Sequence, residues 1–311
     1  MMSYLVTGSE GFLGSHLVEQ YPYNRGVLYA PTVAELDLTD YKMVKDYLKD
    51  KQITHCIHCA TVLRSNAQYP VDVCESNLKM FFNLIRYLPQ NAKMLSLGSG
   101  SEYSRKHWQM NMKESFFDTY VPEDPHSFSK YVISKYIGHS IQSNMASLRI
   151  FGIFGEREDY LYKFVSNTVV KSIHKLPIVV NQNCLFNYLD VQDFCRIVYK
   201  LVDDERLYKM KTINVGHPVN LHLETIVQQV ISIFGEETGL SYQIVDGELG
   251  NPYTPDLTNM MMLLGEDFTF LTLDESISRL KRYYCSIQSK LDIGAIIQDK
   301  YLDYAKSIMK I

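Results

Sequence analysis

Three glycines near the amino terminus have the spacing of a turn that binds phosphate groups. Gly8, Gly11 and Gly14 follow an apolar run at residues 4–7 and stand where a helical pattern begins. The first position permits a tight turn, the second lets backbone N–H groups approach a pyrophosphate, and the third lets helix and strand pack closely. This context predicts a dinucleotide cofactor. The residues expected to hold it here are Gly8, Glu10, Gly11, Phe12, Leu13 and Gly14.

The end of the second predicted strand, residues 29–32, bears on the choice between NAD and NADP. It has no Asp or Glu for a ribose diol, and no Arg or Lys for a 2′-phosphate. Glu10, inside the glycine turn, would repel an additional phosphate because both groups are negatively charged. The sequence therefore predicts NAD or NADP as the cofactor and favours NAD.

Short apolar strands alternate with helical stretches on both sides of this turn. Strands are expected at residues 4–7, 26–29, 53–60, 93–98 and 146–151, and helices at residues 12–19, 41–51, 70–88 and 127–142. This alternation predicts an α/β fold, a Rossmann-type doubly wound parallel sheet with a smaller C-terminal substrate-binding lobe.

After about residue 155 the alternation loosens, although no Pro-, Gly- or Ser-rich linker follows. We expect residues 1–155 to form a dinucleotide-binding domain, with residues 186–216 returning to it, and residues 156–311 to form mainly the substrate-binding lobe. In this second half, strands are expected at residues 178–180 and 213–215, and helices at residues 223–234 and 274–286.

Composition excludes several classes of function. The chain has 311 residues, 46% of them hydrophobic, and a formal net charge of −4, so it lacks the clustered positive charge of a nucleic-acid-binding protein. No apolar run approaches the roughly 18 residues that a membrane-spanning helix needs. The first residues have no basic segment of a secretory signal. We expect a cytoplasmic enzyme with no nucleic-acid or membrane partner.

A cluster of metal-ligand residue types, His55, Cys56, His58 and Cys59, lies in the third predicted strand. Strand alternation sends His55 and Cys59 to one face of the sheet, and Cys56 and His58 to the other. Four such ligands cannot converge on one ion, so no metal site is predicted.

Several further segments together resemble one family. Residues 149–155 are similar to an Arg-x-x-Asn-x-Tyr-Gly motif, with Gly152 and Phe154 at its Asn and Tyr places, and residues 186–193 and 214–216 match two later motifs. With the glycine turn, these resemble the extended short-chain dehydrogenase/reductase family, in its nucleotide-sugar epimerase, dehydratase and reductase branch. The resemblance covers roughly residues 3–220. Residues 34–40 and 97–103 look most like the GDP-fucose synthase type.

The resemblance implies roles for single residues. Asp37 and Leu38 would contact the adenine, and Ala60 and Asn77 would line the cofactor. Ser99 would hydrogen-bond the sugar oxygen that is oxidised or reduced. The resemblance also implies a nucleotide-diphospho-sugar substrate, and a homodimer formed through the helix at residues 127–142 and its neighbour.

The chemistry of this family requires a phenol and a lysine one helical turn apart, and two registers compete for these places. Tyr131 and Lys135 match the pattern literally. His126 and Lys130, five residues upstream, match it with His in place of Tyr. Five residues turn a helix about 140° away from the first face, so the two pairs cannot serve together. The Asp-Pro dipeptide before His126, and the length of chain between Lys130 and the next strand, favour the upstream pair.

The substitution of His for Tyr leaves two interpretations of the upstream register. An imidazole exchanges protons near neutral pH, and a cation beside Lys130 is disfavoured, so His126 is expected to act in its neutral form. In the other interpretation the site is attenuated, Lys130 only binds the cofactor, and the protein is an NAD(P)-binding regulator or scaffold.

The expected reaction is hydride transfer at a sugar carbon in the biosynthesis of surface-polysaccharide sugars, either 4-keto reduction or dehydrogenation, or C4 epimerisation. Dehydratases of this branch carry an acidic pair where Gly100 and Ser101 stand here, and Glu102 comes one residue late, so dehydration stays an alternative. Arg149, Arg157 and Lys163 lie near or after the strand at residues 146–151, where the ligand crevice of such sheets is expected. Arg is suited to bidentate contacts with the diphosphate of the substrate. The expected substrate contacts are Ser99, Ser101, Arg149 and Arg157.

Overall fold

The computed structural model describes residues 2–66, 68–235 and 239–308, and its largest element is a six-stranded sheet in the order β2-β1-β3-β4-β5-β9. All neighbouring strands in it are parallel. The strands are β1 (Ser3–Thr7), β2 (Val27–Tyr29), β3 (His55–His58), β4 (Lys93–Ser99), β5 (Met145–Ile150) and β9 (Thr212–Val215). The predicted α/β class with a Rossmann-type parallel sheet is confirmed.

Helices cover both faces of this sheet, because both faces of its strands are apolar. In β1, Tyr4 and Val6 belong to the core on one face, and Leu5 belongs to the core on the other. The first face is covered by α1 (Phe12–Glu19), α6 (Val191–Leu201), α7 (Glu205–Met210) and α9 (Thr258–Leu264). The second face is covered by α2 (Tyr41–Leu48), α3 (Val73–Tyr87) and α4 (Pro125–His139). This two-sided covering is the doubly wound arrangement.

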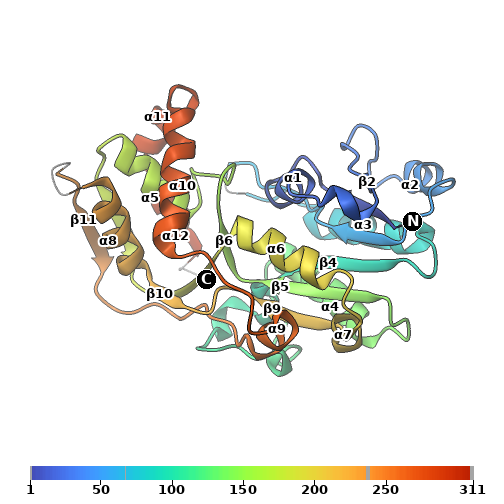
Figure 1. The fold of residues 1–311 in the computed structure, drawn as a ribbon. Helices are drawn as coiled ribbons and strands as arrows, with labels where there is room; N and C mark the ends of the chain where they lie inside the picture. The colour runs from blue at the N-terminus through green and yellow to red at the C-terminus, as the bar shows by residue number, and fades with distance from the viewer. Residues whose placement is uncertain (1, 67, 236–238, 309–311) are drawn as a thin grey trace.

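The carboxyl-terminal half builds a second layer with its own apolar core, shown at the left of Figure 1. It contains a three-stranded sheet in the order β10-β8-β6 and a parallel pair of β11 and β7. Its strands are β6 (Gly152–Phe154), β7 (Ile178–Gln182), β8 (Leu185–Asp190), β10 (Asn220–His222) and β11 (Tyr242–Asp246). Its helices are α5 (Phe164–Ile173), α8 (Leu223–Phe234), α10 (Leu273–Ser286), α11 (Ile293–Ile297) and α12 (Lys300–Ile308).

The secondary structure departs from the expected division at three places, the first of which is β6, inside residues 1–155 but part of the three-stranded sheet. Residues 186–190 belong to β8, which pairs with β6 and β10. The chain therefore returns to the main sheet only from α6 onward. In addition, α9 lies within residues 156–311 but buries Met260, Leu263 and Leu264 against the main sheet. Short apolar stretches such as these carry no periodic signal of the sheet they join.

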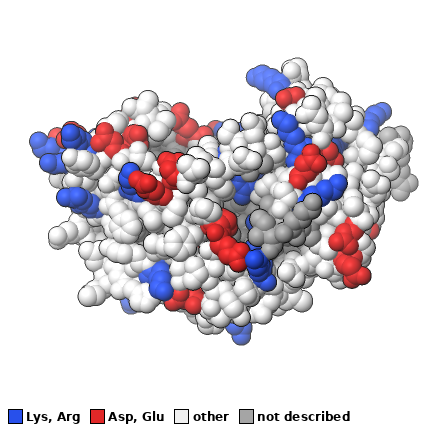
Figure 2. All heavy atoms as spheres, turned by 180° about the vertical axis from the view of Figure 1, so that it is seen from behind, with Lys and Arg blue, Asp and Glu red and all other residues white. Residues whose placement is uncertain are grey.

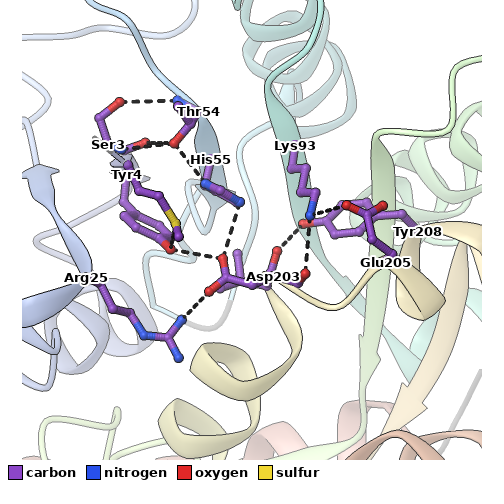
Figure 3. Close-up of polar contacts among 11 residues, drawn as sticks. Ser3, Tyr4, Arg25, Thr54, His55, Lys93, Asp203, Glu205 and Tyr208 are labelled. Atoms are coloured by element: carbon purple, nitrogen blue, oxygen red, sulfur yellow. Dashed lines mark hydrogen bonds and ion pairs between the residues drawn. The ribbon is translucent and has the colours of Figure 1, made fainter.

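The amino-terminal edge of the main sheet is closed by a polar cluster centred on Asp203, which follows α6 (Figure 3). Its carboxylate accepts hydrogen bonds from the Tyr4 hydroxyl at 2.9 Å and from the Arg25 guanidinium at 2.8 Å. Nε2 of His55 lies 3.3 Å from the same carboxylate, and Lys93 donates to the Asp203 carbonyl at 3.2 Å. These contacts join the amino-terminal ends of β1, β3 and β4. Ligands of such parallel sheets bind at the other edge, where the carboxyl ends of the strands lie.

Charges on the face shown in Figure 2 are mixed in sign, with acidic and basic side chains interspersed and a notch in the outline between the two halves. Among the described residues, no helix combines the length and the apolar composition that crossing a bilayer requires.

Candidate active site

The glycine turn has the geometry that a bound pyrophosphate needs. Gly8, directly after β1, has φ +66°, and a Cβ at this position would lie 2.7 Å from the backbone nitrogen of Ala60. A Cβ at Gly14 would lie 2.1 Å from the Gly8 carbonyl oxygen, so α1 approaches β1 this closely only without a side chain there. Gly11 is the N-cap of α1, and within the described residues no side chain caps this helix. Its first N–H groups are therefore available to an anion.

Two side chains of the turn connect it to the loop after β2. The Ser9 hydroxyl donates to the Pro31 carbonyl at 2.7 Å, and the Val33 backbone N–H donates to Glu10 Oε2 at 3.0 Å. The Glu10 carboxylate thus lies at the end of the second strand, where the adenosine ribose of a dinucleotide lies in folds of this kind. A 2′-phosphate at this place would meet a negative charge.

The remaining predicted cofactor contacts are divided between the two faces of the sheet, with Leu13 on the first face and Leu38 on the second. Phe12 and Leu13 begin α1, and Leu38 is buried in the core between the sheet and α2. Asp37 Oδ1 accepts hydrogen bonds from the N–H of Thr39 at 2.8 Å and from its hydroxyl at 2.7 Å. These bonds fix the turn that leads into α2.

Asn77, on α3, connects the loop after β3 to α4. It is almost fully buried, and its Oδ1 accepts a hydrogen bond from the Val62 N–H at 2.9 Å. Its Nδ2 donates to the Ser129 hydroxyl at 3.0 Å and lies 3.5 Å from Nδ1 of His126. A cofactor-lining residue of the prediction thus contacts the predicted catalytic histidine.

Lys130 reaches the carboxyl-terminal edge of the main sheet. Asp124 caps α4 by accepting from the Ser127 N–H at 2.9 Å, which fixes where the helix begins. One turn later, the Lys130 ammonium donates to the Leu97 carbonyl at 3.0 Å. Leu97 stands two residues before Ser99, the end of β4. Burial lowers the pKa of Lys130.

His126 lies in an enclosed, cationic environment. Its ring stacks on Tyr69 with a centroid distance of 4.3 Å and an interplanar angle of 6°. Burial lowers the pKa of His126 to about 3, and nearby positive charges, first among them Lys130, act in the same direction. Asn77 Nδ2, which can only donate, lies 3.5 Å from Nδ1, and this contact is made with the ring proton on Nε2. The imidazole is therefore a neutral hydrogen-bond donor.

The alternative pair, Tyr131 and Lys135, lies on another side of α4. The Tyr131 hydroxyl hydrogen-bonds Asp118, and the Lys135 ammonium pairs with the same carboxylate at 2.9 Å. The Tyr131 ring packs against Phe117 at 5.1 Å. Both polar groups thus have a partner near the surface, whereas His126 and Lys130 converge with Asn77.

Ser99 and Ser101 form a short chain of hydroxyl groups after β4. The Ser99 hydroxyl accepts from the N–H of Ser101 at 3.1 Å and from its hydroxyl at 2.9 Å. Ser99 is thereby the N-cap of the 3-10 helix Gly100–Tyr103. A group that hydrogen-bonds Ser99 can exchange a proton with Ser101 through it.

Glu102 and Arg149 form a buried ion pair directly beneath these serines. The two side chains are 0% and 3% exposed, and Arg149 Nε donates to Glu102 Oε2 at 2.7 Å. Glu102 Oε1 accepts the Ser99 backbone N–H at 2.8 Å, and the Arg149 guanidinium lies 3.8 Å from the Phe117 ring centroid. With its charge used inside the protein, Arg149 is not available to a substrate diphosphate. Glu102 is likewise not available to remove a proton from a sugar.

Arg157 also lies away from the predicted crevice. It follows β6, has φ +67°, and pairs through two nitrogens with the carboxylate of Glu19, at the carboxyl-terminal end of α1. The anion-binding end of α1 is its other end. Lys163, the exposed residue before α5, contributes positive charge at His126. Of the three basic residues named from the sequence, Arg149 and Arg157 are paired with carboxylates of the protein itself, and Lys163 is exposed.

Sequence patterns gave no signal for three residues beside the site. Tyr69 stacks on His126, and Arg64 lies 4.7 Å from the Tyr69 ring centroid. Tyr253 comes from the carboxyl-terminal half, and a Cβ at Gly100 would lie 2.5 Å from its hydroxyl. All three stand in irregular segments, so neither periodicity nor motif spacing marks them.

The structure therefore brings together the glycine turn, Asn77, Ser99, His126 and Lys130 at the carboxyl ends of β1, β3 and β4. Successive strands diverge to either side of β1 in this sheet, which is the point where such folds bind ligands.

Known proteins resemble this chain in sequence and in fold. The family model described as "NAD dependent epimerase/dehydratase family" matches residues 4–216. The GDP-6-deoxy-D-talose 4-dehydrogenase of Aggregatibacter actinomycetemcomitans is 22% identical over 88% of this chain and 94% of its own length. The GDP-L-colitose synthase of Yersinia pseudotuberculosis is 29% identical, but over only 33% of this chain and 35% of its own length.

A solved structure of similar fold is a GDP-L-fucose synthetase from Naegleria fowleri. It has a TM-score of 0.76 and 13% identity, over 93% of this chain and 94% of that one. At this identity the similarity concerns the fold alone.

Proposed function

The chain belongs to the NAD dependent epimerase/dehydratase family, and from this premise we propose that it is an NAD-dependent enzyme that transfers hydride at a carbon of a nucleotide-diphospho-sugar. The reaction is 4-keto reduction, its reverse, or C4 epimerisation, in the biosynthesis of surface-polysaccharide sugars. The observation that carries the proposal is the convergence of His126, Lys130 and Asn77 beside the turn at Gly8.

In this proposal two neutral donors polarise the sugar oxygen. The Ser99 hydroxyl is one donor: it passes its proton to the oxygen of the carbon that gains the hydride and takes a proton from the Ser101 hydroxyl at 2.9 Å, which is replenished from solvent because Ser101 is partly exposed. The His126 ring, neutral at pH 7 because burial lowers its pKa to about 3, is the other: it donates a hydrogen bond to the sugar oxygen and keeps its proton. The bound nicotinamide supplies or accepts the hydride. The histidine thus takes the place of the family's tyrosine as a donor rather than as a charged acid.

Lys130 binds the cofactor rather than the substrate. Its ammonium donates a hydrogen bond to the Leu97 carbonyl at 3.0 Å, two residues before Ser99, the last residue of β4. An ammonium has two further hydrogens when one is used in this way, and a ribose diol offers two oxygens to accept them. Its charge also keeps His126 neutral.

We propose NAD rather than NADP as the cofactor. Glu10 Oε2 lies 3.0 Å from the Val33 nitrogen, at the loop that follows β2. A carboxylate so fixed would repel a 2′-phosphate. The variant Glu10→Gln is expected to lower the ratio of NAD to NADP affinity by about tenfold, the effect of removing one repulsion of about 1.4 kcal/mol. An unchanged ratio in fluorescence titrations would contradict this preference.

Dehydration is the less favoured reaction because Glu102 is fully buried and paired with Arg149 at 2.7 Å. A carboxylate that removes a proton from a sugar carbon must reach that proton. Glu102 instead holds the backbone N–H of Ser99.

The test is turnover of sugars linked to GDP, UDP or dTDP. For 4-keto-6-deoxy sugars it is followed by NADH absorbance, and for 4-hydroxy sugars by chromatography of the product, because C4 epimerisation leaves NADH unchanged. We expect His126→Ala to lower kcat by about 10²-fold or more, the usual cost of removing one positioned hydrogen-bond donor to the reacting oxygen. Tyr131→Phe is the matched control and is expected to retain activity. Loss of turnover in Tyr131→Phe with retention in His126→Ala would overturn the assignment. Tight NADH binding with no turnover of any sugar would favour the regulator or scaffold.

A homodimer through α3 and α4 is part of the proposal, together with a cytoplasmic location. Phe82 on α3 and Tyr136 on α4 are 37% and 40% exposed, and their rings meet edge to face at 5.2 Å. An exposed aromatic pair on two packed helices is suited to an interface. Light scattering should give a dimer for the parent chain and a monomer for Tyr136→Lys. A monomeric parent would exclude the dimer.

A further inference from the structure

Arg64 lies at the entrance of the candidate active site, between aromatic side chains. Its Cζ is 4.7 Å from the ring centroid of Tyr69 and 4.9 Å from that of Tyr304, which belongs to α12. Tyr69 in turn stacks on His126 at 4.3 Å. Tyr69 therefore contacts both the guanidinium and His126, and Tyr304 joins the Arg64 loop to α12, which lies with α5 and α10 in the second half of the chain (Figure 1).

The charge of Arg64 has no acidic partner within the described residues. One of its terminal nitrogens donates to the Tyr304 hydroxyl, a neutral acceptor, and no carboxylate of residues 2–66, 68–235 or 239–308 pairs with it. Arg149 and Arg279, also removed from solvent, pair with Glu102 and Glu156. A partly buried cation without a counter-charge is costly unless an anion joins it.

The surroundings of Arg64 favour an anion of some size. Next to Arg64, an open hollow of about 370 Å³ is lined by Asn66, Gln68, Tyr162 and four residues of α12, namely Lys300, Asp303, Tyr304 and Ser307. Arg64 itself reaches this hollow through Tyr304, and the Asp303 carboxylate is balanced there by the Lys300 ammonium. Lys163 adds positive charge on the His126 side. A diphosphate fits this setting, because the guanidinium fork matches phosphate oxygens in a bidentate way.

We propose that Arg64 binds the diphosphate of the nucleotide-sugar substrate, and that Tyr304 is a gate that occupies the guanidinium until the substrate arrives. This inference rests on the proposed function. The two tyrosine rings keep the guanidinium plane in place, and a phosphate oxygen replaces the Tyr304 hydroxyl as acceptor. The exchange is favourable because a hydrogen bond to an anionic acceptor is roughly twice as strong as one to a neutral acceptor.

The test is calorimetric titration of the full chain with GDP, and in parallel with UDP. Arg64→Gln should weaken binding by about tenfold or more, as expected for losing charge-assisted hydrogen bonds. Arg64→Lys should lie between Arg64→Gln and the parent, because it keeps the charge but not the fork. Tyr304→Phe keeps the ring but frees the guanidinium, so it should bind GDP a few times more tightly. Arg157→Gln is the matched control and should bind as the parent does.

NADH binding by the same variants separates the possible failures. All are expected to bind NADH as the parent does, because Arg64 does not touch the glycine turn. GDP affinity unchanged in Arg64→Gln overturns the anion site while the proposed function stands. Affinity unchanged in Tyr304→Phe overturns the gate alone. A parent chain that binds NADH but neither GDP nor UDP overturns this inference together with the nucleotide-sugar assignment.

Discussion

Replacing Glu102 by Gln tests how the chain supports its reactive serine. The substitution keeps the shape of the side chain and an acceptor for the Ser99 N–H, which now lies 2.8 Å from Oε1. It removes the charge that balances Arg149, whose Nε lies 2.7 Å from Oε2. The guanidinium cannot lose its proton, so the variant buries an unpaired cation in a site where both side chains are at most 3% exposed.

The expected loss of stability is large. Breaking a buried pair by removing one partner costs about 3–5 kcal/mol. For a chain of 311 residues, with an unfolding entropy of about 2.1 cal/mol/K per residue, this corresponds to a fall in Tm of about 5–8 °C. Turnover should fall as well, because the neutral amide holds the Ser99 N–H less firmly.

Differential scanning fluorimetry measures the fall, with two comparisons. Glu75→Gln removes one partner of the exposed pair with Lys79, whose side chains are 66% and 55% exposed, and should change stability by about 0.5 kcal/mol or less. The double variant Glu102→Gln with Arg149→Met removes both buried charges and should recover part of the loss. If Glu102→Gln has the same Tm as the Glu75→Gln control, or if the double variant has a lower Tm than Glu102→Gln, the explanation is wrong.

Three further outcomes are expected. The free energy of unfolding should fall in acid, because burial lowers the pKa values of His126 and His58 to about 3 in the folded chain. The stability that these neutral histidines contribute is complete above about pH 6.5 and is lost as the pH falls towards 3, by roughly 1 kcal/mol per pH unit for each histidine. A Tm that stays level over this range would contradict the prediction. Gly8→Ala should weaken NADH binding by about tenfold or more because of the strained φ of +66° and the close backbone, whereas Gly138→Ala, with open space around it, should keep NADH binding and gain up to about 0.5 kcal/mol of stability; equal NADH affinity in the two variants would exclude the role of the turn. Asp203→Asn should lower the free energy of unfolding in urea by about 1–2 kcal/mol through weaker bonds at the amino-terminal edge of the sheet, without changing the affinity for NADH; a loss of NADH affinity would show that the two edges are coupled.

The sequence was sufficient where local patterns and backbone constraints agree. The helix expected at residues 223–234 is α8 with the same bounds. The strand expected at residues 4–7 differs from β1 by one residue at its start, and the strand expected at residues 146–151 differs from β5 by one residue at each end. Gly8 and Gly14 could be placed because only glycine fits a positive φ or a backbone contact, and that requirement is visible in the spacing. The helix expected at residues 127–142 is α4, Pro125–His139, and it carries both candidate pairs.

Partners distant in the sequence were not predictable. Arg149 looked like a free phosphate-binding residue, because nothing in a single sequence indicates that Glu102 lies 2.7 Å from it. Arg157 pairs with Glu19, 138 residues away, for the same reason. The stacking of Tyr69 on His126 joins two irregular segments, and such contacts follow from tertiary packing rather than from periodicity.

The course of α12 has a practical consequence for handling the protein. This helix carries Tyr304 to Arg64, so a purification tag or a fluorescent domain joined closely behind α12 would burden the helix that contacts the proposed anion site. The amino terminus enters the sheet through β1 at the edge closed by Asp203, on the opposite side from the ligands. Surface immobilisation and labelling should therefore use the amino-terminal end, and binding constants from carboxyl-terminally tagged material should be compared with values from tag-free protein.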